Sequence, residues 1–78
     1  QRIDLTQVEY LLMKNFLENR GRALARDEIM NEVWGRDYHG DLKVVDVNIR
    51  RLRLKIEDDA AAPKCIATIW GFGYKWEA

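Results

Sequence analysis

The sequence has little of what many kinds of reactive site require. It holds one cysteine, one histidine and one proline among 78 residues. A lone Cys65 cannot close an internal disulfide, which fits a reducing compartment. His39 has no second histidine or cysteine close by, so it is a poor basis for a zinc site. We therefore expect no metal and no cofactor, and a solvated loop histidine.

Long apolar runs and an excess of one charge are also missing. No apolar run approaches the ~20 residues of a membrane span. The polar first residues do not match a signal peptide, so we expect neither a leader nor a membrane partner. Thirteen basic and thirteen acidic residues cancel to a formal net charge of zero. A nucleic-acid partner must therefore be argued from how the charges are distributed.

Enzyme signatures are absent in the same way. The chain has no glycine-rich phosphate loop, no metal-ligand spacing and no nucleophile beside a general base. Cys65 falls on a predicted strand, far along the chain from His39, which favours a structural thiol. We expect a protein that is not an enzyme.

The chain does contain ordinary globular composition and one strongly amphipathic segment. Its apolar content is 47%, which fits one small domain over residues 1–78. Placed on a helix, the segment from Lys43 to Ile56 puts a narrow apolar stripe toward a core. The stripe consists of Val45, Ile49, Leu52 and Ile56. The opposite side carries Lys43, Val47, Arg50, Arg51 and Leu54.

This segment also concentrates positive charge. Residues 43–55 include five basic residues and one acid, a balance of +4, so the rest of the chain sums to −4. A helix fits the major groove of B-DNA, where arginine is the commonest reader of guanine. Val47 lies on the same side and suits a thymine methyl group. The segment is either a DNA-reading helix or a solvated helix face.

Two further helices precede it. Thr6 and Glu9 form a capping-box pattern, which predicts a helix running to about residue 18 or 19. That helix is apolar nearly all round, so we expect packing on both sides. We interpret Glu9 as a capping carboxylate paired with an arginine rather than as a catalytic acid. A second helix is predicted at about Arg26–Trp34, where Ala25 occupies the cap position without being able to cap.

A hairpin follows the basic helix. Residues 64–70 and 74–77 read as strands, joined by a turn at Gly71–Gly73. Trp70 and Phe72 stand at its tip, either packed onto the helices or inserted beside a partner. Three helices and a hairpin predict an α+β winged helix-turn-helix, with a recognition helix at about 42–57 and a wing at about 64–77.

Several motifs together carry a family resemblance. They are Leu5-Thr6-x-x-Glu9-Tyr10-x-Leu12, Arg26-Asp27-Glu28-Ile29, Val33-Trp34-Gly35, Val45-Asp46-Val47-Asn48-Ile49-x-x-Leu52-Arg53-x-Lys55 and Thr68-Ile69-Trp70-Gly71-x-Gly73-Tyr74. In order and spacing the chain resembles the effector domain of OmpR/PhoB-type response regulators. That domain begins with several more strands, of which we expect only the last, at Ile3–Leu5. We expect the rest of the N-terminal sheet and the receiver domain to be absent, with reduced stability or self-association as the consequence.

The resemblance implies a role for each site residue. Arg51 and Val47 match the base-contacting positions of the recognition helix. Matches to DNA-backbone contacts are Trp34, Lys43, Asn48, Arg50, Arg53, Thr68 and Tyr74. Trp70 and Phe72 form the wing tip. The segment that resembles the polymerase-facing loop comprises Gly35, Arg36, Asp37, Tyr38, His39, Gly40 and Asp41.

The resemblance also implies partners. Family members bind double-stranded promoter DNA as head-to-tail dimers, meet RNA polymerase, and answer a sensor kinase that acts on the receiver, in the bacterial cytoplasm. Lys43, Asn48 and Trp70 depart from the family's usual arginine, histidine and wing arginine. We expect a weaker or purely packing role for the Trp70 tip. The alternative function is a winged-helix module that binds an acidic protein without DNA.

Overall fold

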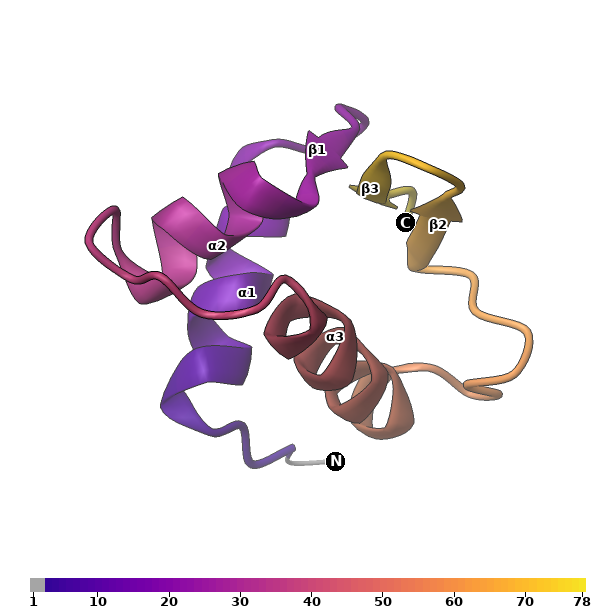
Figure 1. Ribbon diagram of the computed structural model, residues 1–78. Helices are drawn as coiled ribbons and strands as arrows, with labels where there is room; N and C mark the ends of the chain where they lie inside the picture. Colours follow the sequence, from indigo (N-terminus) through magenta and orange to yellow (C-terminus); the bar gives the residue numbers. More distant parts are fainter. Residues whose placement is uncertain (1–2) are drawn as a thin grey trace.

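The computed structural model describes residues 3–78 and shows three helices and a small sheet (Figure 1). In chain order the elements are α1 (Gln7–Glu18), β1 (Leu24–Ala25), α2 (Arg26–Trp34), α3 (Lys43–Ile56), β2 (Ile66–Ile69) and β3 (Gly73–Trp76). The helices pack together, and the sheet lies beside α3 and the start of α2 (Figure 1). The predicted winged helix is confirmed, with helix bounds within a residue or two of those expected from the sequence.

The start of α1 is fixed by its capping box, as predicted. The amide of Thr6 donates to Glu9 Oε1 at 2.9 Å, and the amide of Glu9 donates to Thr6 Oγ1 at 3.2 Å. The partner of Glu9 is Lys55 of α3, at 2.6 Å, so the expected arginine was wrong. Lys55 Nζ also donates to the carbonyl of Asp4 at 2.9 Å. Burial disfavours the charge of Glu9, but hydrogen bonds from Lys55 and Thr6 outweigh it and hold the pKa of Glu9 below its usual value.

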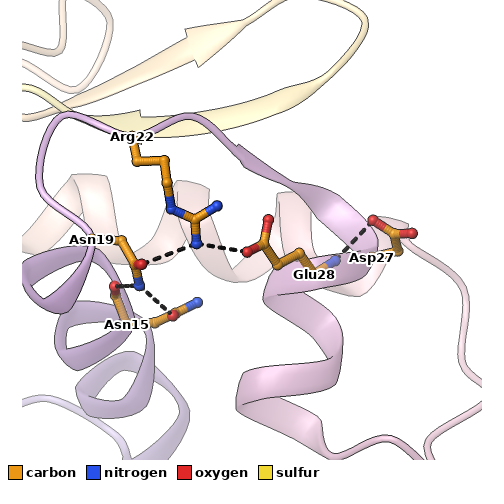
Figure 2. Close-up of polar contacts among 5 residues, drawn as sticks. All are labelled: Asn15, Asn19, Arg22, Asp27 and Glu28. Carbon is orange, nitrogen blue, oxygen red and sulfur yellow. Dashed lines mark hydrogen bonds and ion pairs between the residues drawn. The ribbon is translucent and has the colours of Figure 1, made fainter.

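A polar cluster joins the end of α1 to the first turn of α2 (Figure 2). One guanidinium nitrogen of Arg22 donates to Asn19 Oδ1 at 3.0 Å and to Glu28 Oε2 at 2.7 Å. Asn19 in turn donates to the carbonyl of Asn15 at 2.8 Å. Ala25 stands at the N-cap of α2 and makes no side-chain hydrogen bond, as predicted.

The core is formed by the inner sides of all three helices and the sheet. Its buried apolar residues are Leu12, Phe16, Leu24, Ile29, Met30, Val45, Ile49, Leu52, Ile66, Tyr74 and Trp76. The predicted stripe of α3 is confirmed, with Ile56 partly buried at its end. Packing on both sides of α1 was wrong among residues 3–78, because Tyr10 is 58% and Leu17 40% exposed. Association through that surface stays a prediction.

The sheet has the order β1-β3-β2 and is antiparallel throughout. The predicted hairpin is confirmed, with Ile66 opposite Trp76 and Ile69 opposite Gly73. Its first strand is shorter than predicted, so Cys65 does not lie on a strand, and Gly73, expected in the turn, begins β3. Strand β1, which pairs Leu24 with Tyr74, was not predicted. Residues 3–5 form no strand, so the N-terminal strand expected at Ile3–Leu5 was wrong. Both edges of β3 are already paired by β1 and β2. Gln1 and Arg2, which precede the expected strand, lie outside the described residues.

The connection between α2 and α3 positions the basic helix. Gly35 ends α2 with a φ of 101°, which favours glycine, as expected for a helix stop. Asp41 contributes to the start of α3, since its Oδ1 accepts a hydrogen bond from the amide of Lys43 at 2.9 Å. The N-cap residue itself is Leu42, so Asp41 acts from the position before the N-cap.

The connection between α3 and β2 is anchored by one carboxylate. Glu57 accepts hydrogen bonds from the amides of Lys64, Cys65 and Ile66, at distances of 2.9 to 3.1 Å. Burial opposes the charge, but these amides outweigh it and lower the pKa of Glu57 from its ordinary value of 4.5. A carboxyl group with a lowered folded pKa stabilises the protein above its unfolded pKa. That contribution is lost as pH falls through the lower folded pKa.

Replacement of Glu57 with glutamine should therefore lower the free energy of unfolding by about 1.5 kcal/mol at neutral pH, because an amide accepts from fewer N–H groups and carries no charge. The difference should shrink as the pH falls below the ordinary value of 4.5, where the carboxyl group of the unfolded chain becomes protonated, and it should be lost below the lower pKa of the folded state. Urea unfolding at several pH values measures it. Asp58→Asn, on an exposed neighbour, is the matched control and should show little change. Equal stability of Glu57→Gln and wild type at neutral pH would contradict the anchoring role.

Candidate DNA interface

One face of α3 is exposed and basic, and its charged side chains have no partner among residues 3–78. It consists of Lys43, Val47, Arg50, Arg51 and Leu54, the set opposite the buried stripe. Val47 is 48% and Leu54 66% exposed. Within residues 3–78 neither Arg50 nor Arg51 has a hydrogen bond or ion pair. Their charges are therefore available to an outside partner, with two apolar groups between them.

The two flanks of α3 are used internally, and each contacts a different part of the fold. On one flank Asn48 donates to the carbonyl of Val44 at 2.8 Å, and Lys55 is held by Glu9. The charge of Lys55 is thus compensated within the domain. Of the five basic residues in the segment, the structure leaves three facing solvent opposite the core. The backbone contact expected of Asn48 stays a prediction.

The other flank faces the hairpin. Arg53 donates from one terminal nitrogen to the carbonyl of Ile66 at 2.7 Å and to Thr68 Oγ1 at 2.8 Å. Its guanidinium carbon lies 5.4 Å from the centre of the Tyr74 ring, a cation–π arrangement. The Nε atom of Arg53 is buried without a hydrogen-bond partner in the part of the chain that the structure describes. Three residues expected to contact the DNA backbone are thus brought together and contact one another.

Tyr74 is the most buried of these three. Its side chain lies in the core, and its hydroxyl donates to Asp46 Oδ1 at 2.7 Å. Asp46 Oδ2 accepts from Arg26 at 2.8 Å. Burial and the neighbouring Asp46 carboxylate raise the pKa of Tyr74 to about 12, so it remains a hydrogen-bond donor at neutral pH.

Sequence reasoning missed the role of Asp46. The residue appeared only as a member of a motif, with no partner assigned. Two signals were available: it is the one acid within α3, and it stands seven residues before Arg53, which places both on one flank of the helix. Neither signal identifies Tyr74 or Arg26, because those contacts depend on tertiary packing.

The wing tip projects into solvent. Trp70 is 90% and Phe72 49% exposed, in the turn between β2 and β3. The packing of Trp70 onto the helices was therefore a wrong expectation. The hairpin presents a bare aromatic ring at its end, and a weaker role on DNA stays a prediction.

The loop between α2 and α3 is held by aromatic stacking. The rings of Trp34 and Tyr38 lie 6.3 Å apart, and Trp34 is half-buried. Arg36, Asp37 and His39 are exposed along the same loop. The loop of residues 35–41 therefore has a defined conformation and exposes polar side chains. Its contact with RNA polymerase stays a prediction.

Other chemistries find little support in the described structure. Among residues 3–78, no three histidine, cysteine or carboxylate side chains gather in a way that could hold a metal ion. Burial and the nearby Glu57 raise the pKa of the Cys65 thiol, which leaves it protonated at neutral pH. None of the helices in this range is long and apolar enough to cross a membrane.

Comparison with known proteins places these features in a family. The family model described as "Transcriptional regulatory protein, C terminal" matches residues 1–76. The sensory transduction protein RegX3 of Mycolicibacterium smegmatis is 45% identical over 75 residues, which cover 96% of this chain and 33% of RegX3. The chain therefore spans about a third of the length of that relative.

Two solved structures show the same fold. Response regulator DrrB, a Thermotoga maritima OmpR/PhoB homologue, is 35% identical with a TM-score of 0.91, over 100% of this chain and 35% of DrrB. The DNA-binding domain of RstA from Klebsiella pneumoniae, solved in complex with the RstA box, is 29% identical with a TM-score of 0.85, over 96% of this chain and 74% of that domain. The matched family is one of transcriptional regulatory domains and not of enzymes. The chain belongs to the OmpR/PhoB family of C-terminal transcriptional regulatory domains, the winged-helix DNA-binding domains of response regulators.

Proposed function

We propose that α3 reads promoter DNA in the major groove while the wing, residues 64–77, contacts the flanking backbone or minor groove. The observation that carries this proposal is the exposed face of α3, where the side chains of Lys43, Arg50 and Arg51 have no hydrogen bond or ion pair within the part of the chain that the structure describes. Its two apolar members suit thymine methyl groups. The RstA neighbour, bound to its DNA box, supports a DNA-facing surface on this fold.

Individual roles follow from exposure and the family match. Arg51 is proposed to contact guanine and Val47 a thymine methyl group, while Lys43 and Arg50 neutralise phosphates. Trp34, at the end of α2, and Asn48, on a flank of α3, are proposed as further backbone contacts. The backbone contacts expected of Arg53, Thr68 and Tyr74 compete with the bonds these residues already make within the domain.

The partners of a whole regulator are proposals of the same kind. A relative three times as long carries further sequence outside this domain, which suits a receiver that a sensor kinase phosphorylates. We propose head-to-tail dimers on direct repeats, and contact between the loop of residues 35–41 and RNA polymerase. On the same basis we propose a location in the bacterial cytoplasm.

Selection from a randomised duplex pool tests the function. The domain is titrated by fluorescence anisotropy at two salt concentrations, and the retained duplexes are sequenced. Enrichment of a repeated short half-site, with binding that weakens steeply in salt, is the expected result. Binding without enrichment would leave only a non-specific electrostatic interaction. No binding to any duplex at low salt would favour the protein-interaction alternative.

A second measurement isolates the phosphate contacts. Arg50→Ala should weaken binding to every duplex to a similar degree and lower the slope of log affinity against log salt by about one unit, because one fewer counterion is released. Arg20→Ala, on an exposed residue near the end of α1, is the matched control and should leave the slope unchanged. An Arg50→Ala domain with the wild-type slope would remove Arg50 from the interface.

A further inference from the structure

A polar network ties the wing to the recognition helix through a single carboxylate. Oδ1 of Asp46 accepts from the Tyr74 hydroxyl at 2.7 Å, and its Oδ2 accepts from Arg26 at 2.8 Å. Tyr74 belongs to β3 and Arg26 to the first turn of α2. One side chain of α3 thereby fixes two other elements relative to its own helix.

Two turns further along the same flank, Arg53 repeats the connection. It binds the carbonyl of Ile66 and the hydroxyl of Thr68 on β2, and its guanidinium lies over the ring of Tyr74. The hairpin is therefore held against α3 at two points, one through each strand. Hydrogen bonds that share partners in this way are mutually dependent, so loss of one member weakens the others.

The charge of Asp46 is unexpected on this helix. It is the one acid among the fourteen residues of α3, and its side chain is about a third exposed. Phosphates along bound DNA lie within about a Debye length, 8–10 Å, of such a helix, where an acid repels them. A carboxylate that acted only through its charge would therefore lower DNA affinity. The hydrogen bonds that Asp46 accepts from Tyr74 and Arg26 would instead raise DNA affinity, because they hold the wing and α2 against α3.

We infer that Asp46 is a positioning residue, which with Tyr74 and Arg53 fixes the wing relative to the recognition helix so that both meet one duplex in a single register. The inference rests on the proposed function, because it concerns how α3 and the wing act together on DNA. It assigns Tyr74 and Arg53 to this network rather than to independent phosphate contacts. A site is effective when supporting hydrogen bonds hold its contacting groups in place.

A double-mutant cycle tests the inference. Asp46→Ala, Tyr74→Phe and the double variant are titrated by fluorescence anisotropy against a labelled duplex retained by the selection and against the random duplex pool. Asp46→Ala should bind the retained duplex about tenfold more weakly than wild type, although it removes an acid. Tyr74→Phe should weaken binding in the wild-type chain and have little further effect in Asp46→Ala, because its hydroxyl no longer has a partner there.

Asp58→Ala is the charge-matched control, since Asp58 is an exposed acid in the connection after α3. It should bind DNA as tightly as wild type or slightly more tightly. Amide hydrogen exchange of the free proteins gives a second readout. In Asp46→Ala the amides of β2 and β3 should exchange faster while those of α1 keep their protection.

Unchanged or tighter DNA binding by Asp46→Ala would overturn the inference, because charge alone predicts that result. Additive effects of Asp46→Ala and Tyr74→Phe would overturn it as well, since they would make Tyr74 an independent DNA contact. If Asp46→Ala does not fold, Asp46→Leu and Tyr74→Phe complete the cycle, because leucine is close to aspartate in size and cannot accept the hydrogen bond. A wild-type domain that binds no duplex would overturn the proposed function and this inference with it, whereas additivity in a DNA-binding domain overturns the inference alone.

Discussion

Replacement of Gly73 by alanine is expected to destabilise the domain by about 3 kcal/mol, which lowers the melting temperature by roughly 12–24 °C for a chain of this size. An ideal Cβ at this position would lie 1.9 Å from the carbonyl oxygen of Leu24 and 3.0 Å from the Cα of Ala25. Both are backbone atoms, so no side chain can rotate away to relieve the overlap. The added methyl group must push β1 away from β3.

The separation of β1 from β3 would disturb the core. Leu24 is 1% exposed, and its register partner Tyr74 is packed beside it in the core. Thermal and urea unfolding followed by circular dichroism measure the effect. Gly71→Ala, in the turn just before β3, is the matched control, since no atom lies within 4 Å of its Cβ position and only the left-handed φ of 76° opposes the change. That strain costs about 1 kcal/mol. Equal stability of the two variants would contradict the close-approach argument for Gly73.

The same glycine illustrates what the sequence could and could not predict. The turn-forming Gly-Phe-Gly segment correctly predicted a hairpin, because the signal is local. The pairing of Gly73 with Ala25 joins residues far apart in sequence, and β1 is only two residues long. So short a strand carries no alternation that a reader of the sequence could detect. Strand β1 exists only because it pairs with β3. The sequence reveals β3 only through its hairpin with β2.

The helices were predictable for a related reason. Their apolar spacing and caps are set within a few residues, so α1, α2 and α3 could be placed to within a residue or two. The partners of side chains were not predictable in the same way. Glu9 was recognised as a capping carboxylate, but its ion pair with Lys55 spans 46 residues of sequence. The family resemblance assigned Arg53 and Tyr74 to contacts with the DNA backbone. In the structure both side chains form hydrogen bonds within the domain.

Within the candidate DNA interface, the sequence predicted best the side chains that make no contact elsewhere in the described structure. Burial of one stripe of α3 forces the opposite stripe outward, so the exposed face follows from the period of the helix alone. Function requires in addition that the exposed cations lack internal partners, which only the structure shows. That distinction separates Arg50 and Arg51 from Lys55 and Arg53, although all four lie in the same basic segment.

Arg51→Ala should cost about 1–3 kcal/mol of binding to the selected duplex, or about 5- to 150-fold in affinity, and the loss should be confined to one base pair. Its guanidinium is exposed and unpaired within residues 3–78, so the substitution leaves no buried group unsatisfied and little of the effect should come from folding. Titrations of single-base variants of the selected duplex measure the discrimination at each position. The wild-type domain should prefer guanine at one position by this factor, and Arg51→Ala should bind all four bases there nearly equally.

Arg50→Ala provides the matched comparison, because Arg50 is the adjacent exposed arginine on the same face of α3. A phosphate contact lowers affinity for every duplex alike, so Arg50→Ala should retain the full base preference while its salt slope falls. The two variants therefore separate reading from anchoring within one pair of neighbouring residues. If Arg51→Ala keeps the wild-type discrimination at every position, Arg51 contacts no base and the specificity of α3 must come from Val47, from another exposed side chain or from the shape of the DNA.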